Sequence, residues 1–236
     1  YRPKWVDEVR LVIKHADYIP DEQIIPFLDL LCKLVDPSKT LLFMTRWQEP
    51  KLQVPNWVTG EHGIKFGREA RKRGFRTMYF ANYFGITPNH PRFDEFKPYF
   101  IKNPYTHEVE GWNLKEEWSV ASEIKLYYVN PASKLWREYQ ISQFKALFEE
   151  HPADGLFIDQ SFVMFNDGNG LIDGQSTVDG NLSFHRGLVE ALPGVALGGE
   201  SINEVTMQYE AFCELHFLSL NLEPDNQGVY GWKIDP

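Results

Sequence analysis

Two acidic residues stand where short apolar runs of this chain end. The run in DGLFID stops at Asp159, and the run in GVALGGE stops at Glu200. A carboxylate placed directly after buried apolar residues is costly unless it is paired, so a simple capping role explains Asp159 poorly. Two carboxyl groups facing each other on neighbouring strands suit acid–base or nucleophilic cleavage of a glycosidic bond. The sequence therefore predicts Asp159 and Glu200 as a catalytic pair.

Polar and aromatic residues also follow the other apolar runs. Such residues either bind a ligand or cap helices and satisfy loop backbone, and the sequence leaves both alternatives open for Thr45, Asn82 and Asn221. The glycine pair before Glu200 allows another group to approach the backbone closely. Asn82 and Gln160 are also candidates to keep Asp159 ionised. The residues expected to bind substrate are Asp17, Arg46, Trp47, Asn82, Tyr83, His90, Gln160, Asn203 and Asn221.

Apolar runs alternate with amphipathic patterns along most of the chain, which indicates alternating strands and helices. The pattern predicts strands at residues 9–15, 40–45, 75–82, 154–159, 194–200 and 215–221. It predicts helices at residues 21–35, 61–74, 131–151, 181–192 and 203–214.

This order of elements predicts an α/β fold with a parallel sheet and right-handed crossovers. No GxGxxG motif follows the first strand, so a dinucleotide-binding fold is not favoured. A parallel (β/α) barrel of the TIM type fits better, although such a barrel needs eight units in about 250 residues. We expect residues 1–236 to form a single (β/α) barrel catalytic domain, or a fragment of one that lacks its last units. An open sheet is the alternative.

Two long connections, residues 82–127 and 160–181, follow the carboxyl ends of predicted strands. In a barrel this is the active-site face, and long loops are usually functional. We therefore expect the two connections to wall a substrate cleft. Aromatic rings can serve as platforms for sugars, although any one ring is more often a packing residue. The candidates for sugar contacts are Trp47, Tyr83, His90, Tyr105, His107 and Trp112.

The segment from about Tyr127 to Glu204 resembles retaining α-glycosidase barrels. ADGLFID followed by ALGGES is similar to the strands on which the α-amylase superfamily presents an Asp nucleophile and then a Glu acid/base. YYVNPASKLWREY is similar to a segment that precedes those strands. The resemblance implies a nucleophile at Asp159 and an acid/base at Glu200. Phe157 stands where α-amylases have Arg, which favours the endo-α-N-acetylgalactosaminidase group or a relative, and hence extracellular or cell-surface glycan processing.

The predicted function is therefore hydrolysis of an α-linked glycan by a retaining two-carboxylate mechanism. A catalytically inactive carbohydrate-binding barrel is one alternative, because fold alone does not decide function. A metal-dependent barrel hydrolase is another, but the first strand ends in KHAD and offers a single histidine. NDGNGLIDGQ does not match a calcium loop, since Leu171 and Val178 occupy ligand positions.

The acid pair and the resemblance imply a carbohydrate substrate as the partner, and composition argues against other partners. The formal net charge is −9, which argues against a nucleic-acid partner. No apolar run approaches the roughly 20 residues of a membrane span, so no membrane partner is expected. Cys32 and Cys213 form no metal-binding or disulfide pattern, and we expect no metal site and no cofactor.

Overall fold

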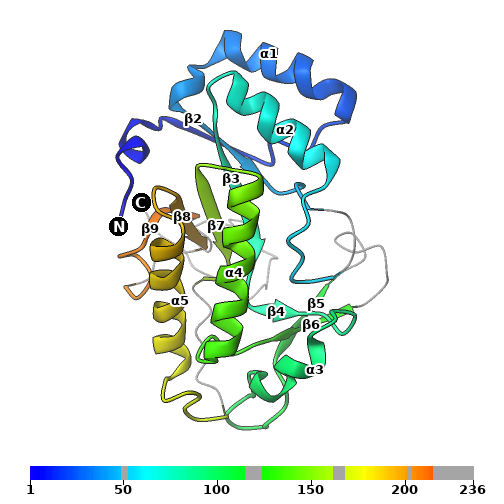
Figure 1. The fold of residues 1–236 in the computed structure, drawn as a ribbon, viewed down its shortest axis with the longest axis vertical. Coiled ribbons are helices and arrows are strands. Elements are labelled where there is room, and N and C mark those ends of the chain that lie inside the picture. The colour runs from blue at the N-terminus through cyan, green and yellow to red at the C-terminus, as the bar shows by residue number, and fades with distance from the viewer. Residues whose placement is uncertain (49–52, 115–123, 162–167, 201–203, 215–236) are drawn as a thin grey trace, which may run out of the picture.

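The computed structural model describes residues 1–48, 53–114, 124–161, 168–200 and 204–214. Its main sheet contains six parallel strands that follow one another in chain order, β1-β2-β3-β7-β8-β9 (Figure 1). The sheet curls into part of a (β/α) barrel, as the alternation of elements predicted. Its strands are β1 (Leu11–Lys14), β2 (Thr40–Met44), β3 (Arg76–Asn82), β7 (Gly155–Asp159), β8 (Ala196–Glu200) and β9 (Glu210–Glu214).

Helices cover the outer face of this sheet. Figure 1 shows α4 and α5 side by side in front of the sheet, with α1 and α2 together at its upper end. Ser133 and Ser176 cap α4 and α5, and Ser176 forms a capping box with Asp179. Gly74 follows α2 with a φ of 87°, so its missing side chain permits the turn that was predicted there. The helices are α1 (Ile24–Leu34), α2 (Glu61–Lys72), α4 (Lys134–Glu150) and α5 (Thr177–Ala191).

Successive residues of each strand point to opposite faces, and this alternation builds two apolar layers. Outward-facing residues such as Tyr79, Ile158 and Leu197 join the main core with Phe144 and Phe184 of the helices. Inward-facing residues form a second, smaller cluster inside the curl of the sheet. That inner cluster contains Leu41, Phe43, Met78 and Phe157, packed against Trp5, Val9, Phe80 and Phe212.

The first long connection is a small subdomain and not the loop that the sequence predicted. It forms an antiparallel sheet in the order β4-β6-β5, and helix α3 (Phe93–Phe96) precedes β5. The second long connection contacts it, because the Gly168 N–H donates to the Lys102 carbonyl at 2.7 Å. These strands pair with one another across the connection, and such pairing is not shown by a local sequence pattern. They are β4 (Gly85–Ile86), β5 (Gly111–Leu114) and β6 (Ile124–Tyr128).

The predicted helix at residues 203–214 is wrong. Turns occupy residues 204–209, where the Thr206 carbonyl accepts hydrogen bonds from the N–H groups of Tyr209 and Glu210 at 2.8 and 3.1 Å. Strand β9 then begins at Glu210, and Phe212 packs against the Trp5 ring with a centroid separation of 5.9 Å. Burial of Phe212 in the inner cluster overrides the local helical pattern. The strand predicted at residues 215–221 lies outside the described residues.

Membrane-spanning helices were also sought in the described part of the chain. None of the helices there has the length and the apolar character needed to cross a bilayer.

We expect Gly180→Ala to destabilise the protein although alanine favours helix formation. A Cβ at Gly180 would overlap the backbone of Pro131 and Ala132, where α5 meets the segment before α4. Overpacking of this kind costs about 1–3 kcal/mol, against a gain of up to about 1 kcal/mol from helix propensity. Urea unfolding followed by circular dichroism measures the difference.

Gly187→Ala is the matched control on the same helix. Its Cβ would lie 2.6 Å from Ile141 Cδ1, the end of a side chain that can move, so the loss of stability should be smaller. Equal losses for the two variants would contradict the proposed backbone contact.

Candidate active site

A polar layer lies at the carboxyl ends of the central strands, on the inner face of the sheet. Asn82, Asp159 and Glu200 are the last residues of β3, β7 and β8. Each lies two residues beyond an inward-facing residue, namely Phe80, Phe157 or Gly198, so all three point to the same side. The alternation of the strands therefore gathers three polar groups above an apolar floor.

Phenylalanine rings form that floor. The Phe157 ring lies 4.9 Å from the Phe43 ring and 5.9 Å from the Phe80 ring, measured between centroids. Phe43 and Phe157 are buried, and an apolar surrounding strengthens the electrostatic interactions of the polar groups above it. Phe157 is the residue that replaces Arg in the α-amylase pattern, and here it completes an aromatic layer.

Asp159 is held by the neighbouring strand. Asn82 and Asp159 are direct partners in the parallel register of β3 and β7. The Asn82 Nδ2 donates to Asp159 Oδ2 at 2.9 Å, and the Asn82 Oδ1 accepts from the Gly85 N–H at 3.2 Å. The second bond fixes the orientation of the amide, so its donor side faces the carboxylate. Asp159 is half-buried, which leaves it accessible to a ligand.

Glu200 is linked to the turn that follows Asp159. Its Oε2 accepts a hydrogen bond from the Gln160 backbone N–H at 2.8 Å. Gln160 has a φ of 58°, a left-handed conformation that non-glycine residues adopt rarely and at functional sites disproportionately often.

Tyr128, at the end of β6, is a member of the site that sequence reasoning missed. Its hydroxyl accepts from the Gln160 Nε2 at 3.3 Å, and Asn82 donates to the Gln160 Oε1 at the same distance. Burial raises the pKa of Tyr128; the bond from Gln160 opposes the rise and the nearby Asp159 carboxylate adds to it. In the sequence, Tyr128 stands out only as part of the YYVNPASKLWREY segment. That segment does not show that the end of β6 contacts the turn after β7.

Asp17 and Arg46 lie at the ends of β1 and β2, but Asp17 has a structural role. The Asp17 carboxylate is fully buried and accepts from the backbone N–H groups of Thr45 and Arg46 at 3.0 and 2.6 Å. This replaces the expected substrate contact, because both carboxylate oxygens are used by the chain itself. The Arg46 side chain is exposed at the same edge of the sheet and stays a candidate for substrate binding.

Trp47, Tyr83 and His90 are buried, which corrects their prediction as sugar contacts. Trp47 and Tyr83 have no exposed surface, and the Trp47 Nε1 donates to the Phe80 carbonyl at 2.7 Å. Tyr83 stacks on Phe184 of α5 with centroids 4.1 Å apart, and its hydroxyl bonds to Asn181. His90 lies against Tyr139 of α4 at 3.1 Å, and burial lowers its pKa. The face that an aromatic residue adopts after a strand end is set by tertiary packing, which the sequence pattern did not show.

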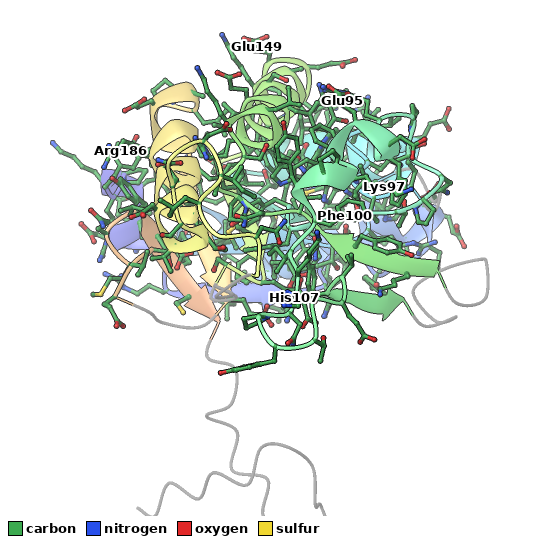
Figure 2. All side chains as sticks on the ribbon, turned by 90° about the horizontal axis from the view of Figure 1, so that it is seen from below. Glu95, Lys97, Phe100, His107, Glu149 and Arg186 are labelled. Atoms are coloured by element: carbon green, nitrogen blue, oxygen red, sulfur yellow. The ribbon has the colours of Figure 1, made fainter. Side chains whose placement is uncertain are left out.

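The remaining predicted contacts are Tyr105, His107, Trp112, Asn203 and Asn221. Tyr105 is 90% exposed and His107 is exposed, both in the turn of the inserted subdomain. Figure 2 shows His107 on the side of the molecule away from Glu149 of α4. The backbone of Trp112 belongs to β5. Asn203 and Asn221 lie outside the described residues.

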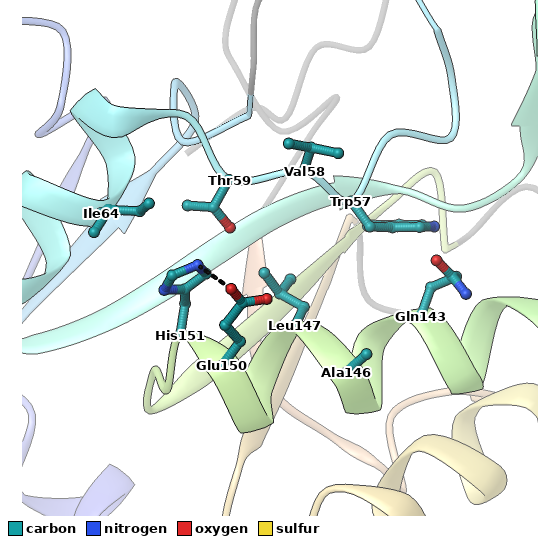
Figure 3. A pocket seen from close by; sticks show the side chains of 9 residues that line it. All are labelled: Trp57, Val58, Thr59, Ile64, Gln143, Ala146, Leu147, Glu150 and His151. Atoms are coloured by element: carbon teal, nitrogen blue, oxygen red, sulfur yellow. Dashed lines mark ion pairs between the residues drawn. The ribbon is translucent and has the colours of Figure 1, made fainter.

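A pocket of about 300 Å³ lies on the outer layer (Figure 3). Neither Asp159 nor Glu200 is among the residues that line it. It is bounded by the segment Trp57, Val58 and Thr59 on one side and by residues of α4 on the other. Figure 3 shows the Thr59 hydroxyl pointing toward Glu150 and His151. This pocket is separate from the predicted cleft between the two long connections. In the described part of the chain, no three or more His, Cys, Asp or Glu side chains are grouped as metal ligands.

No protein-family model and no curated protein matches the sequence. Several solved structures with a similar fold are glycoside hydrolases built on (β/α) barrels. A GH36 alpha-galactosidase from Geobacillus stearothermophilus, in complex with raffinose, superposes with a TM-score of 0.65 at 11% identity, over 90% of this chain and 31% of that one. This chain therefore spans about a third of that enzyme's length.

Two further structures agree in fold. An alpha-galactosidase from Thermus thermophilus, in complex with p-nitrophenyl alpha-D-galactopyranoside, has a TM-score of 0.57 at 14% identity, over 84% of this chain and 38% of that chain. A family GH13_31 enzyme has a TM-score of 0.56 at 13% identity, over 84% of this chain and 47% of that chain. At these identities the comparison establishes the barrel fold and leaves activity to the site.

The buried Asp17 carboxylate predicts a pH dependence of stability. Burial raises the pKa of Asp17, while the Thr45 and Arg46 N–H groups oppose the rise, so the folded protein binds this proton more tightly than the unfolded chain. The contribution of Asp17 to stability therefore increases as pH falls through its folded pKa. We expect the free energy of unfolding of wild type, relative to Asp17→Asn, to rise between pH 7 and about 4.

Asp36→Asn is the control, with the opposite sign. Bonds from Ser38 lower the pKa of the exposed Asp36, so its stabilising contribution is lost as pH falls through that lowered pKa. Urea unfolding of the three proteins between pH 7 and about 4 measures the Asp17 difference, and extending it to about pH 2 measures the Asp36 difference. A wild-type to Asp17→Asn difference that shrinks with falling pH would contradict the effect of burial.

Proposed function

We propose that this protein is a glycoside hydrolase that cleaves an α-linked glycan with retention of configuration. In this proposal residues 1–236 are the catalytic barrel, or part of it. The observation that carries it is that Asp159 and Glu200 end adjacent parallel strands on the inner face of the sheet. Adjacent strands are about 4.8 Å apart, which suits the separation of about 5–5.5 Å that retaining glycosidases use.

In the first step the Asp159 carboxylate attacks the anomeric carbon, and the bond from that carbon to the leaving oxygen breaks. Asn82 keeps the attacking carboxylate oriented through its bond to Oδ2. Glu200 gives a proton to the departing oxygen, and its carboxyl group is held in place by the Gln160 N–H, which bonds to Oε2.

In the second step Glu200 removes a proton from a water molecule, which attacks the same carbon and releases Asp159. Two inversions give net retention. Gln160, Arg46 and Asn82 are the predicted substrate-binding residues that surround this edge, and Tyr128 joins them as a hydroxyl donor. The aromatic floor closes the lower side of the site. The water molecule that attacks in the second step therefore approaches from the open side.

The choice of first substrates comes from the structural neighbours. The Geobacillus and Thermus enzymes were crystallised with raffinose and with an aryl α-galactoside, so α-galactosides are the first compounds to test. The likeness of DGLFID and ALGGES to the endo-α-N-acetylgalactosaminidase group makes α-N-acetylgalactosaminides the second. A carbohydrate-binding barrel without activity is the rival proposal; it expects that one of these glycans binds and is recovered uncleaved.

Asp159→Ala should lower kcat/KM on a cleaved α-glycoside by at least about 1,000-fold, because no covalent intermediate can form. Asp154→Ala is the matched control at the other end of β7. It removes an ion pair with Arg76 at 2.7 Å and should lower stability while turnover persists. Full activity of Asp159→Ala would remove this residue from the mechanism.

Glu200→Ala should slow glycosides with poor leaving groups far more than activated aryl glycosides, because only the former need a proton. Added azide should restore turnover of the activated substrate and give a glycosyl azide of retained configuration. Product stereochemistry is read by NMR. An azide product of inverted configuration would show that Asp159 does not form the covalent intermediate.

A further inference from the structure

A buried polar cluster lies behind the two acids, between the end of β8 and helix α5. Its side chains come from four separate parts of the chain, yet they lie together on the outward side of the sheet. Burying polar groups is costly unless they find hydrogen-bond partners. The members of this buried cluster are Tyr83, Ser161, Asn181, His185 and Glu210.

Ser161 connects this cluster to both acid-bearing strands. Its Oγ accepts a hydrogen bond from the Glu200 backbone N–H at 3.0 Å. Its carbonyl accepts from the Asn181 Nδ2 of α5 at 3.0 Å. Ser161 also directly follows Gln160, whose N–H reaches the Glu200 carboxylate. One residue thus joins the backbone of Glu200, the turn after Asp159 and the helix behind them.

The glycine before Glu200 makes this approach possible. A Cβ on Gly199 would overlap both the Ser161 Oγ and the Glu210 Oε1. The small residues of GGE, which the sequence marked as a place of close approach, therefore admit the serine hydroxyl and a buried carboxylate.

Helix α5 holds Ser161 from the other side. The His185 Nδ1 donates to the Asn181 carbonyl at 2.9 Å, and its Nε2 lies 3.3 Å from the Glu210 Oε1. The Tyr83 hydroxyl bonds to the Asn181 Oδ1, which leaves the Asn181 Nδ2 directed at Ser161. All these groups are buried, so solvent does not compete for their hydrogen bonds.

We propose that Ser161 is a positioning residue for the acid/base Glu200, held by the buried cluster on α5. Its hydroxyl fixes the Glu200 backbone against the turn after Asp159, and this sets the Glu200 carboxylate within reach of the Gln160 N–H. The inference rests on the proposed function, because it assigns the group that orients the acid of that mechanism. The Glu200 carboxyl group is then held in the position from which it serves the leaving oxygen.

Ser161→Ala tests the proposal through leaving-group dependence. Loss of one positioning hydrogen bond should lower kcat on a poor leaving group about tenfold, with KM unchanged. An activated aryl glycoside needs no proton and should be affected little. In the double variant Ser161→Ala/Glu200→Ala, the serine substitution should add no further loss, since the residue acts through Glu200.

Ser183→Ala is the matched control, because it removes a serine hydroxyl on α5 that accepts from Gln175 at 2.9 Å and has no bond to Glu200. It should leave the leaving-group dependence unchanged. If Ser161→Ala does not fold, Ser161→Cys keeps a side chain there with a weak acceptor and should show the same pattern. Equal losses on both substrates, or additive losses in the double variant, would overturn the positioning role.

Backbone amide exchange separates this inference from the proposed function. Hydrogen exchange of the Glu200 amide should be faster in Ser161→Ala than in wild type and Ser183→Ala. If wild type cleaves no α-glycoside, the proposed function fails and Glu200 has no acid role to position. In that case, faster exchange would show only that Ser161 holds the Glu200 backbone through its hydrogen bond. Unchanged exchange would contradict even this structural role.

Discussion

The parallel register of β3, β7 and β8 is the constraint on which the rest of the site depends. It places Asn82 opposite Asp159 and sets Glu200 at the end of the next strand, all on the inner face. A slip of one residue in any strand would turn its polar end group toward the helices. The same alternation that packs the aromatic floor therefore delivers the polar groups above it, and neither layer can change without the other.

The turn after β7 connects the polar groups at these strand ends through hydrogen bonds. A left-handed residue at Gln160 aims its N–H across to Glu200, while its side chain reaches toward Asn82 and Tyr128. Such a conformation is unfavourable for glutamine and persists only where surrounding contacts specify it. Ser161 and the buried cluster behind it provide those contacts. The contacts that attach helix α5 to this cluster therefore also help to orient the two carboxylates.

The sequence predicted the parts that local patterns encode. Apolar runs ending at Asp159 and Glu200 located both strand ends, and the order of elements predicted the parallel barrel with units missing. The inserted sheet and β9 were missed, because the inserted strands form by pairing with one another across the connection and Phe212 is extended for tertiary reasons. Trp47 and Tyr83 were placed in the cleft since a strand-end position does not reveal whether a ring turns inward. Tyr128 and Ser161 depend on contacts between distant segments, and no local pattern shows these.

Phe157 gives the site its particular electrostatic character. An arginine at this inward position would place a full positive charge two residues before Asp159. Here the ring packs on Phe43 and Phe80, and an unpaired charge in that apolar layer would be costly. Asn82 instead supplies an oriented dipole at 2.9 Å, itself fixed by the Gly85 N–H. Among the described residues, the Asn82 amide and the turn at Gln160 therefore orient this carboxylate through neutral donors, where an arginine would act through its charge.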